Sequence, residues 1–412
     1  MKRSLGRWFN GLVIAAGLSV ASAATAAPIT PTAPASKFYN SLGINGHVWY
    51  ANTIWYKRLV ELGVPNLRGK IATNRGAADQ LKPFFASGGK LNASIVASSG
   101  GTLNKDEATR NIAFLKNYIG VQNLSGIEGP NEFNASSGTV PNWATVERDF
   151  VKWTHDTVRA DPAFNGVPLI APSVYRRLTA DYAALGDLSA WVDEGCIHYY
   201  SGDRRPPLTG SPSFTMEASL KAASVLAPGK PIRMTESGWQ AVAGTMPITL
   251  RAQAKYVVRD YFDSFSYGVP KTFMYQIQDD QTNLWGLTDP NGNPKPAFLA
   301  LKNLVQLVRD TGTSSGTVGY TISGAPPTLK SYSFTRSDGS ALIAFYLDVD
   351  SWNKSTKKDV ETSVPVTVTL SAPASKVEVF QPTFNSAAIA TGSGSTISTP
   401  ATDQLTIIRV TR

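Results

Sequence analysis

The sequence predicts a (β/α)8 barrel followed by a smaller all-β sandwich, and three observations support this fold class. From about Gly43, short apolar segments alternate with longer segments of helical period, which is typical of βα units around a parallel sheet. Eight such units occupy residues 43–310, a length that suits one closed barrel. After Asp310 the pattern changes to short alternating segments separated by turns, as in a β-sandwich.

Each expected barrel strand is a short apolar segment followed by a segment with a helical pattern. The eight segments are Gly43–Val48, Asn66–Ile71, Leu91–Val96, Ser125–Pro130, Pro168–Ala171, Cys196–Tyr199, Ile232–Thr235 and Thr272–Ile277. An open doubly wound sheet is the rival arrangement. No glycine-rich phosphate loop follows the first segment, so the barrel is favoured.

The remaining parts of the chain differ in composition from the barrel. Residues 27–42 are rich in Pro, Ala, Thr and Ser, which predicts a flexible leader that could add one strand to the sandwich. Thr311–Gly316 is the expected linker, and residues 311–412 form the expected sandwich domain. Its expected strands are Lys330–Thr335, Ala341–Leu347, Pro365–Leu370, Lys376–Phe380 and Gln404–Val410.

Residues 1–26 have the pattern of a secretory signal peptide. Lys2, Arg3 and Arg7 precede an apolar run over Gly11–Val20, and small residues with A-x-A spacing follow. The run is too short for a comfortable membrane span, which needs about 20 apolar residues. We therefore expect a secreted or periplasmic mature protein with no membrane span. Removing three cations and no acids lowers the formal net charge from +9 to +6.

Charge and composition exclude several classes of protein. The positive excess is spread along the chain, and no nucleic-acid motif accompanies it, so we expect no nucleic-acid partner. The single cysteine, Cys196, lies in an apolar segment and reads as a small core residue. Three scattered histidines do not suggest a metal site, so we expect no metal and no cofactor. The sequence does not indicate the oligomeric state.

Two carboxylates follow expected barrel strands, where a barrel of this kind places its active site. Glu132 lies in Gly129–Asn134 after the fourth strand, and Glu236 follows Thr235 after the seventh strand. The ends of these two strands face each other across a barrel mouth. Two carboxyl groups that flank one bond are what glycosidic cleavage requires.

The chain resembles the clan A glycoside hydrolases over residues 43–310. These barrel enzymes have an Asn-Glu pair after the fourth strand and a nucleophilic Glu after the seventh, which Asn131-Glu132 and Glu236 match. A C-terminal sandwich is also common in the clan, particularly in the branch with β-xylosidases and exopolysaccharide hydrolases. Further matching residues are Arg68 in the second strand and His198 and Tyr200 after the sixth.

The resemblance implies a role for each matching residue. Glu132 would act as the general acid and then the general base, with a pKa raised by burial and by the negative charge of Glu236. Glu236 would be the nucleophile of a retaining, double-displacement reaction. Asn131 would bind the 2-hydroxyl of the sugar, while Arg68 and Tyr200 would donate hydrogen bonds to Glu236. The expected partner is a polysaccharide or oligosaccharide.

The eighth strand departs from the pattern of the clan. Many members have a tryptophan at its end as a floor for the sugar, whereas this chain reads Phe273–Gln278 there. Tyr275, Gln276 or Trp285 could take this role. Trp239 could stack on a sugar, since aromatic planes accept the apolar face of a sugar ring. Other candidates for sugar contact are Asn45, His47 and His198.

Three other acids near strand ends need an interpretation. Alternation places Glu128 on the same face as Glu132, and a structural ion pair with Arg68 is favoured over a catalytic role. Asp279 and Asp280 follow the eighth strand and are the rival catalytic carboxylates.

Two classes of function besides a hydrolase stay open at this point. The same scaffold could bind carbohydrate without cleaving it, or serve as a surface protein that uses its sandwich for contact. Two acids facing one bond argue against a pure binder. The sequence names neither the sugar nor endo or exo action.

Overall fold

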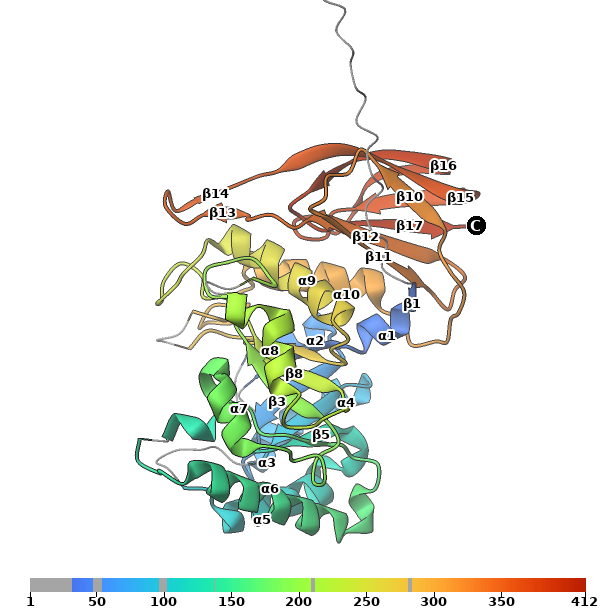
Figure 1. Cartoon of the computed structure of the whole chain (residues 1–412). Coiled ribbons are helices and arrows are strands. Elements are labelled where there is room, and N and C mark those ends of the chain that lie inside the picture. Colours follow the sequence, from blue (N-terminus) through green and yellow to red (C-terminus); the bar gives the residue numbers. More distant parts are fainter. Residues whose placement is uncertain (1–31, 47–53, 96–101, 137, 209–211, 281–283) are drawn as a thin grey trace, which may run out of the picture.

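The computed structural model describes residues 32–46, 54–95, 102–136, 138–208, 212–280 and 284–412. A parallel barrel and a separate mixed β-sheet domain account for almost all of them, which confirms the expected fold class (Figure 1). The expected signal peptide and His47 lie outside the described residues.

The barrel consists of eight parallel strands in the spatial order β6-β5-β4-β3-β2-β9-β8-β7. A single bridge between Ile170 and Glu194 joins the two ends of this order, so the barrel is nearly closed. The fourth and seventh barrel strands are therefore β5 and β8. The strands are β2 (Leu42–Asn45), β3 (Asn66–Lys70), β4 (Lys90–Ser94), β5 (Leu124–Glu128), β6 (Leu169–Ile170), β7 (Gly195–Tyr199), β8 (Ile232–Ser237) and β9 (Thr272–Met274).

Helices cover the outside of the barrel strands. Several begin at a capping side chain that accepts a backbone N–H, such as Asn104 before α5 and Thr249 before α9. The helices are α1 (Ala35–Tyr39), α2 (Trp55–Leu62), α3 (Arg75–Gln80), α4 (Lys82–Ala86), α5 (Lys105–Phe114), α6 (Trp143–Arg159), α7 (Thr179–Leu185), α8 (Met216–Ala223), α9 (Leu250–Ser266) and α10 (Pro296–Val308).

The segment before the barrel is more ordered than expected. Residues 35–39 form α1, and its Phe38 is fully buried against Phe262 and Phe334. The expectation of a flexible leader as far as residue 42 is wrong for this part, because the burial of Phe38 fixes it. Ala33–Pro34 forms β1, which pairs in parallel with β11, so the leader does add a strand to the C-terminal domain.

The C-terminal domain is built on a seven-stranded mixed sheet with the order β1-β11-β12-β17-β15-β10, and β16 pairs with β15. β13 and β14 form a separate hairpin that projects at the upper left of Figure 1. The strands are β10 (Tyr320–Ser323), β11 (Leu329–Thr335), β12 (Ala341–Leu347), β13 (Trp352–Asn353), β14 (Lys358–Asp359), β15 (Ser363–Phe380), β16 (Ala388–Thr402) and β17 (Thr406–Thr411).

The central strand β12 buries both of its faces. Leu342, Ala344 and Tyr346 belong to the core shared with the barrel, whereas Ile343 and Phe345 belong to the domain's own core. Helices α9 and α10 lie between the barrel strands and this sheet (Figure 1). The two parts therefore share one continuous apolar interface.

Buried ion pairs reinforce this interface along α9. Lys255 pairs with Asp403 at 2.7 Å, and both side chains are completely buried. Asp263 forms an ion pair with Lys330 of β11 at 2.6 Å. Burial is tolerable for such charges only when each has a partner. Helix α9 follows the strand that carries Glu236, so the C-terminal domain holds the helix behind the site.

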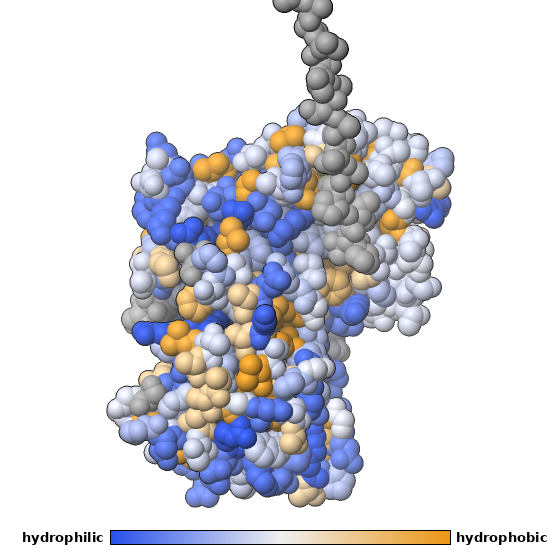
Figure 2. All heavy atoms as spheres, in the orientation of Figure 1, coloured by the Kyte–Doolittle hydropathy of each residue, from blue (hydrophilic) through white to orange (hydrophobic). Residues whose placement is uncertain are grey.

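The surface shows no single dominant apolar area in the orientation of Figure 1. Hydrophobic residues occur there in small groups among hydrophilic ones (Figure 2). Within the described part of the chain, no helix combines the length and the apolar character that a membrane crossing needs.

Candidate active site

Glu236 lies near the end of β8 and is held by two donors. Arg68 Nη1 donates to Glu236 Oε1 at 2.6 Å, and the Tyr200 hydroxyl donates to Oε2 at 2.6 Å. Only 12% of the Glu236 side chain is exposed. Hydrogen bonds to both oxygens fix the orientation of this carboxylate.

Arg68, on β3, is the hub of the site. Its Nε and Nη2 donate hydrogen bonds to Glu128, and the shortest of these is 2.6 Å, from Nη2 to Oε1. Nη1 donates to Asn45 Oδ1 at 3.0 Å and Nη2 to Asn131 Oδ1 at 2.7 Å. Burial alone would lower the pKa of Arg68, but the negative charges of Glu128 and Glu236 outweigh burial and raise it well above its ordinary value. All five N–H groups of the guanidinium thus have acceptors.

Glu128 is the structural ion-pair partner that the sequence analysis favoured. It is fully buried at the end of β5 and pairs with Arg68. Asn92 of β4 donates to its other oxygen at 2.5 Å. Because both oxygens are engaged away from solvent, Glu128 sets the position of Arg68 and has no access to a substrate.

Glu132 follows β5 with a backbone in the left-handed region, at φ 50°. This conformation is costly for a residue with a Cβ, by about 1–3 kcal/mol. Ser173 compensates, because its backbone oxygen and its hydroxyl accept the Glu132 N–H at 3.2 and 3.1 Å. The Glu132 side chain is 27% exposed and reaches His198 Nδ1 at 2.8 Å. The strained backbone turns this carboxyl group toward the mouth of the barrel.

The pKa of Glu132 lies below its ordinary value, so the expectation of a raised pKa is wrong. Burial raises it, but the hydrogen bond from His198 and the charges of His198 and Arg68 outweigh burial. Arg68 Nη2 lies 3.4 Å from His198 Nε2, on the opposite side of the ring from Nδ1, which lies 2.8 Å from Glu132 Oε1. The sequence did not reveal this donor to Glu132.

The two glutamates come together around His198. Its Nδ1 lies 2.8 Å from Glu132 Oε1 and 3.4 Å from Glu236 Oε2. One carboxylate oxygen of each glutamate and this ring nitrogen all lie within 4.8 Å of one another. Two carboxyl groups brought together in this way are what the cleavage of a glycosidic bond requires.

The same cluster is a poor host for a metal ion. Glu132, His198 and Glu236 supply three potential ligand atoms, but Arg68 already places a cation 2.6 Å from Glu236. A second cluster joins Glu128, Cys196 and His198. Burial raises the pKa of the Cys196 thiol well above its ordinary value, which keeps it protonated. A metal would need the thiolate.

Two aromatic side chains form a rim beside Glu236. The Trp285 ring lies 4.9 Å from the Tyr200 ring, edge to face, and 6.3 Å from the Tyr275 ring. Burial and then the charges of Glu236 and Asp280 raise the pKa of Tyr275, so Asp280 lies near this rim. Gln276 is only 1% exposed and cannot offer a floor. Of the three candidates for that role, Tyr275 and Trp285 stand at the site.

Three further candidates do not contact open space at the site. Trp239 is 1% exposed, packs on Tyr256 and donates from Nε1 to the Arg204 oxygen, so the expected stacking on a sugar is wrong. Asn45 is buried. Its Oδ1 accepts from Arg68 and its Nδ2 donates to backbone oxygens of neighbouring strands, so Asn45 supports Arg68. Asp279 is buried against Lys295 at 2.5 Å and is no rival carboxylate.

Residues on neighbouring strands that support the site were not predicted from the sequence. Asn92 links Glu128 to the buried Arg233, which donates to its Oδ1 at 2.6 Å. Ser237, next to Glu236, donates to Asp260 Oδ2 of α9 at 2.7 Å. Burial raises the pKa of Asp260 to about 7. Alternation along the third expected strand could have placed Asn92 inside the barrel, but nothing in the sequence indicates its partner.

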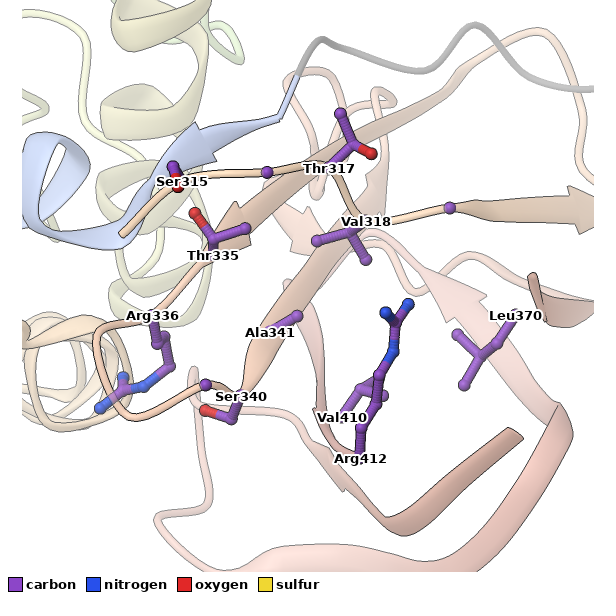
Figure 3. Close-up of a pocket in the computed structure, with 13 residues that line it drawn as sticks. Ser315, Thr317, Val318, Thr335, Arg336, Ser340, Ala341, Leu370, Val410 and Arg412 are labelled. Atoms are coloured by element: carbon purple, nitrogen blue, oxygen red, sulfur yellow. The ribbon is translucent and has the colours of Figure 1, made fainter. Parts of the chain in front are cut away.

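A hollow of about 260 Å³ lies elsewhere, in the C-terminal domain (Figure 3). Val318, Leu370 and Val410 form its apolar side, and Arg412 extends between them. Its lining includes no barrel residue and none of the carboxylates discussed above. The candidate chemistry therefore belongs to the barrel mouth.

Comparison with known proteins finds similarity in structure only. No family model matches the chain, and no curated protein matches its sequence. A family 39 glycoside hydrolase from Bacteroides cellulosilyticus WH2 superposes with a TM-score of 0.62 and 16% identity, over 92% of this chain and 83% of that one. A family 39 enzyme from Xanthomonas axonopodis pv. citri gives 0.59 and 14%, over 96% and 100%.

A family 51 arabinofuranosidase from Xanthomonas axonopodis pv. citri is also similar, with a TM-score of 0.56 and 14% identity, over 92% of this chain and 97% of that one. The likeness covers the barrel and the C-terminal domain together. The resemblance to clan A glycoside hydrolases thus extends from a few motif residues to the fold of the whole chain.

Proposed function

We propose that this chain is a retaining glycoside hydrolase in which Glu236 is the nucleophile and Glu132 the general acid/base. The observation that carries the proposal is the placement of these two carboxylates, from β8 and β5, within 4.8 Å of each other at the mouth of the barrel. A non-catalytic sugar-binding protein has no need of this spacing.

In the first step a Glu236 carboxylate oxygen attacks the anomeric carbon of the sugar. The new bond is an ester between the sugar and Glu236, and the bond to the leaving oxygen breaks. Glu132 gives its proton to that oxygen as the bond breaks. Arg68 and Tyr200 keep Glu236 oriented for attack, since each donates to one of its oxygens at 2.6 Å.

In the second step a water molecule replaces the leaving group. Glu132, now ionised, takes a proton from the water while the water oxygen attacks the anomeric carbon. The ester bond breaks and Glu236 regains its negative charge. His198 stabilises the ionised Glu132 between the two steps through the 2.8 Å contact from Nδ1.

Three residues support sugar binding in this proposal. Asn131 precedes the acid/base, and Arg68 donates to its Oδ1 at 2.7 Å, which fixes the side chain beside Glu132, where it would contact a sugar hydroxyl. Tyr275 and Trp285 would face the sugar ring from the side of β9. Because Glu132 must start protonated and its pKa is lowered, we expect activity on the acid side of neutrality.

The test is a panel of polysaccharides, with release of reducing sugar measured for the wild type and for Glu236→Ala. We expect release by the wild type on at least one member and a loss of at least a thousandfold in the variant, because the attacking group is gone. Equal release by both proteins would remove Glu236 from the mechanism. Binding of the same polysaccharide by both proteins, without release by either, would favour the sugar-binding function.

Secretion is part of the proposal and is supported by the sequence alone. Residues 1–26 combine a basic start, an apolar run and small residues with A-x-A spacing. A polysaccharide too large to enter a cell is consistent with an enzyme that acts outside the cytoplasm. The mass of the protein recovered from the culture medium or the periplasm would show whether these residues are removed.

A further inference from the structure

The segment that follows β6 borders the acid/base. Ser173 accepts the Glu132 N–H, and Asn131 and Ser173 form a parallel bridge. Two residues later, the Tyr175 N–H donates to Asn134 Oδ1 at 2.7 Å, and Asn134 Nδ2 donates back to the Tyr175 oxygen at 3.1 Å. Tyr175 and Arg176 are therefore fixed directly beside the loop that carries Glu132.

The backbone of this segment is strained at two successive positions. Arg176 has φ 63° and Arg177 has φ 54°, and neither residue is a glycine. Each such conformation costs about 1–3 kcal/mol and is found mainly where a site requires it. The strain orients the two arginine side chains differently.

The side chain of Arg177 points inward, and its guanidinium group is occupied by contacts within the protein. Its guanidinium donates to the Tyr200 oxygen at 3.1 Å and to Ser219, and it lies over the Tyr199 ring at 4.6 Å. Burial lowers its pKa. Arg177 thus supports the strand end from which Tyr200 reaches Glu236 and is not available to a ligand.

The side chain of Arg176 points outward and is accessible to a ligand. Its guanidinium lies over the exposed ring of Tyr175, 4.9 Å from the ring centre, and among the described residues it has neither an ion pair nor a hydrogen bond. A guanidinium over a ring can still offer N–H groups to a ligand, and its fork of donors matches the two oxygens of a carboxylate. Tyr175 is 38% exposed and offers an apolar surface next to these donors.

We infer that Tyr175 and Arg176 form a subsite for a carboxylate-bearing sugar, so that the substrate is an acidic, uronate-containing polysaccharide. The inference rests on the proposed function. Because Glu132 protonates the leaving oxygen, residues beside Glu132 contact the leaving-group side of the scissile bond. The acidic sugar therefore lies on that side, with its carboxylate on the Arg176 guanidinium and its ring against Tyr175.

The test compares acidic polysaccharides with the same polymers after chemical reduction of their carboxyl groups. Glucuronoxylan, alginate and xanthan serve as probes, each in native and carboxyl-reduced form. Affinity electrophoresis in the Glu236→Ala background measures binding without turnover. We expect at least one native polymer to bind about tenfold more tightly than its reduced form, as a charge-assisted contact predicts. Adding Arg176→Gln should bring this ratio close to one.

Arg110→Gln is the matched control, because Arg110 is an equally exposed arginine on the outer helix α5. It removes the same charge and should leave the ratio unchanged. A ratio near one for all three polymers in the parent protein would overturn the inference, as would a preference that survives Arg176→Gln. Hydrolysis by the Glu236→Ala parent would instead overturn the proposed nucleophile, while the binding ratio still decides the subsite.

Discussion

The two glutamates of the site are held in opposite ways. Glu236 is 12% exposed and receives a donor on each oxygen, one of them the guanidinium of Arg68. Glu132 is 27% exposed, stands on a strained backbone and meets His198 on one oxygen. The first environment fixes the orientation of the carboxylate, and the second leaves the carboxyl group more exposed. The contrast supports the proposed roles of Glu236 as the nucleophile and Glu132 as the acid/base.

The residues behind the two glutamates differ in the same way. Glu236 is backed by Ser237 and Asp260 on α9, and the buried pair of Lys255 and Asp403 ties α9 to the C-terminal domain. Glu132 is backed by Ser173 and by the short segment after β6. The half of the mouth around Glu236 is therefore tied to the C-terminal domain through α9, whereas the half around Glu132 carries exposed residues such as Tyr175.

Among changes to the surroundings of the two glutamates, the largest effect is expected from removing a donor to the proposed nucleophile, Glu236. Tyr200→Phe deletes the hydroxyl that donates to Glu236 Oε2 at 2.6 Å. A hydrogen bond to a charged group contributes about 1.5–3 kcal/mol, so kcat should fall by about 10- to 100-fold. Steady-state kinetics on the substrate found in the panel measure this loss.

Tyr199→Phe is the control for that loss. Tyr199 is the adjacent residue and its hydroxyl donates to the Pro207 oxygen, away from Glu236. Its kcat should stay within about threefold of the wild type. If the two variants lose activity equally, the Tyr200 hydroxyl has no special role and the contrast between the glutamates is weakened.

The next effect concerns the acid/base and is a shift in pH rather than a loss. His198 holds the pKa of Glu132 down by donating from Nδ1 to the ionised form. His198→Phe keeps a planar ring and removes that donor, so the pKa of Glu132 should rise. The limb of kcat/KM that falls with rising pH reports the acid in the free enzyme. We expect that limb to move to higher pH.

His155→Phe provides the comparison, since His155 lies on α6 and pairs with Asp156 away from the barrel mouth. Its pH profile should match that of the wild type. A His198→Phe profile with an unchanged or lowered basic limb would show that His198 does not control the protonation of Glu132.

Much of the fold could be predicted from the sequence. The eight barrel strands lie within a few residues of the expected segments, because alternation of apolar runs and helical stripes reflects burial directly. Helix α1 could not be predicted, since Phe38 alone marks it and its burial depends on Phe262 and Phe334. These contacts join distant parts of the chain, and local patterns do not contain them.

The site was predictable in its reacting groups and less so in their surroundings. Glu132, Glu236 and Arg68 follow from position at strand ends and from the resemblance. The burial of Trp239 could not be predicted, because its nearness to Glu236 in the sequence does not fix the direction of its side chain, which packs on Tyr256. The pKa of Glu132 was misjudged, since burial was counted and the donor from β7 was not.

A third glutamate shows what burial does without donors. Glu147 lies on the buried face of α6, and neither of its oxygens has a hydrogen-bond partner among the described residues. Burial raises its pKa well above the ordinary 4.5. In the unfolded chain the same carboxyl group ionises near its ordinary pKa. Between these two pKa values the unfolded state binds fewer protons than the folded state, so this residue makes stability fall as pH rises.

Glu147→Met should therefore stabilise the protein without altering the site. Its expected effect on activity is the smallest of these predictions, and its effect on stability tests what the absence of hydrogen-bond donors costs a buried carboxyl group. The gain should be small at pH 4, where both states are largely protonated, and should grow to about 1–3 kcal/mol at pH 7. Thermal unfolding at the two pH values measures the gain, with the exposed Glu217→Met of α8 as the control. A gain of equal size at both pH values would mean that Glu147 destabilises through its shape and packing.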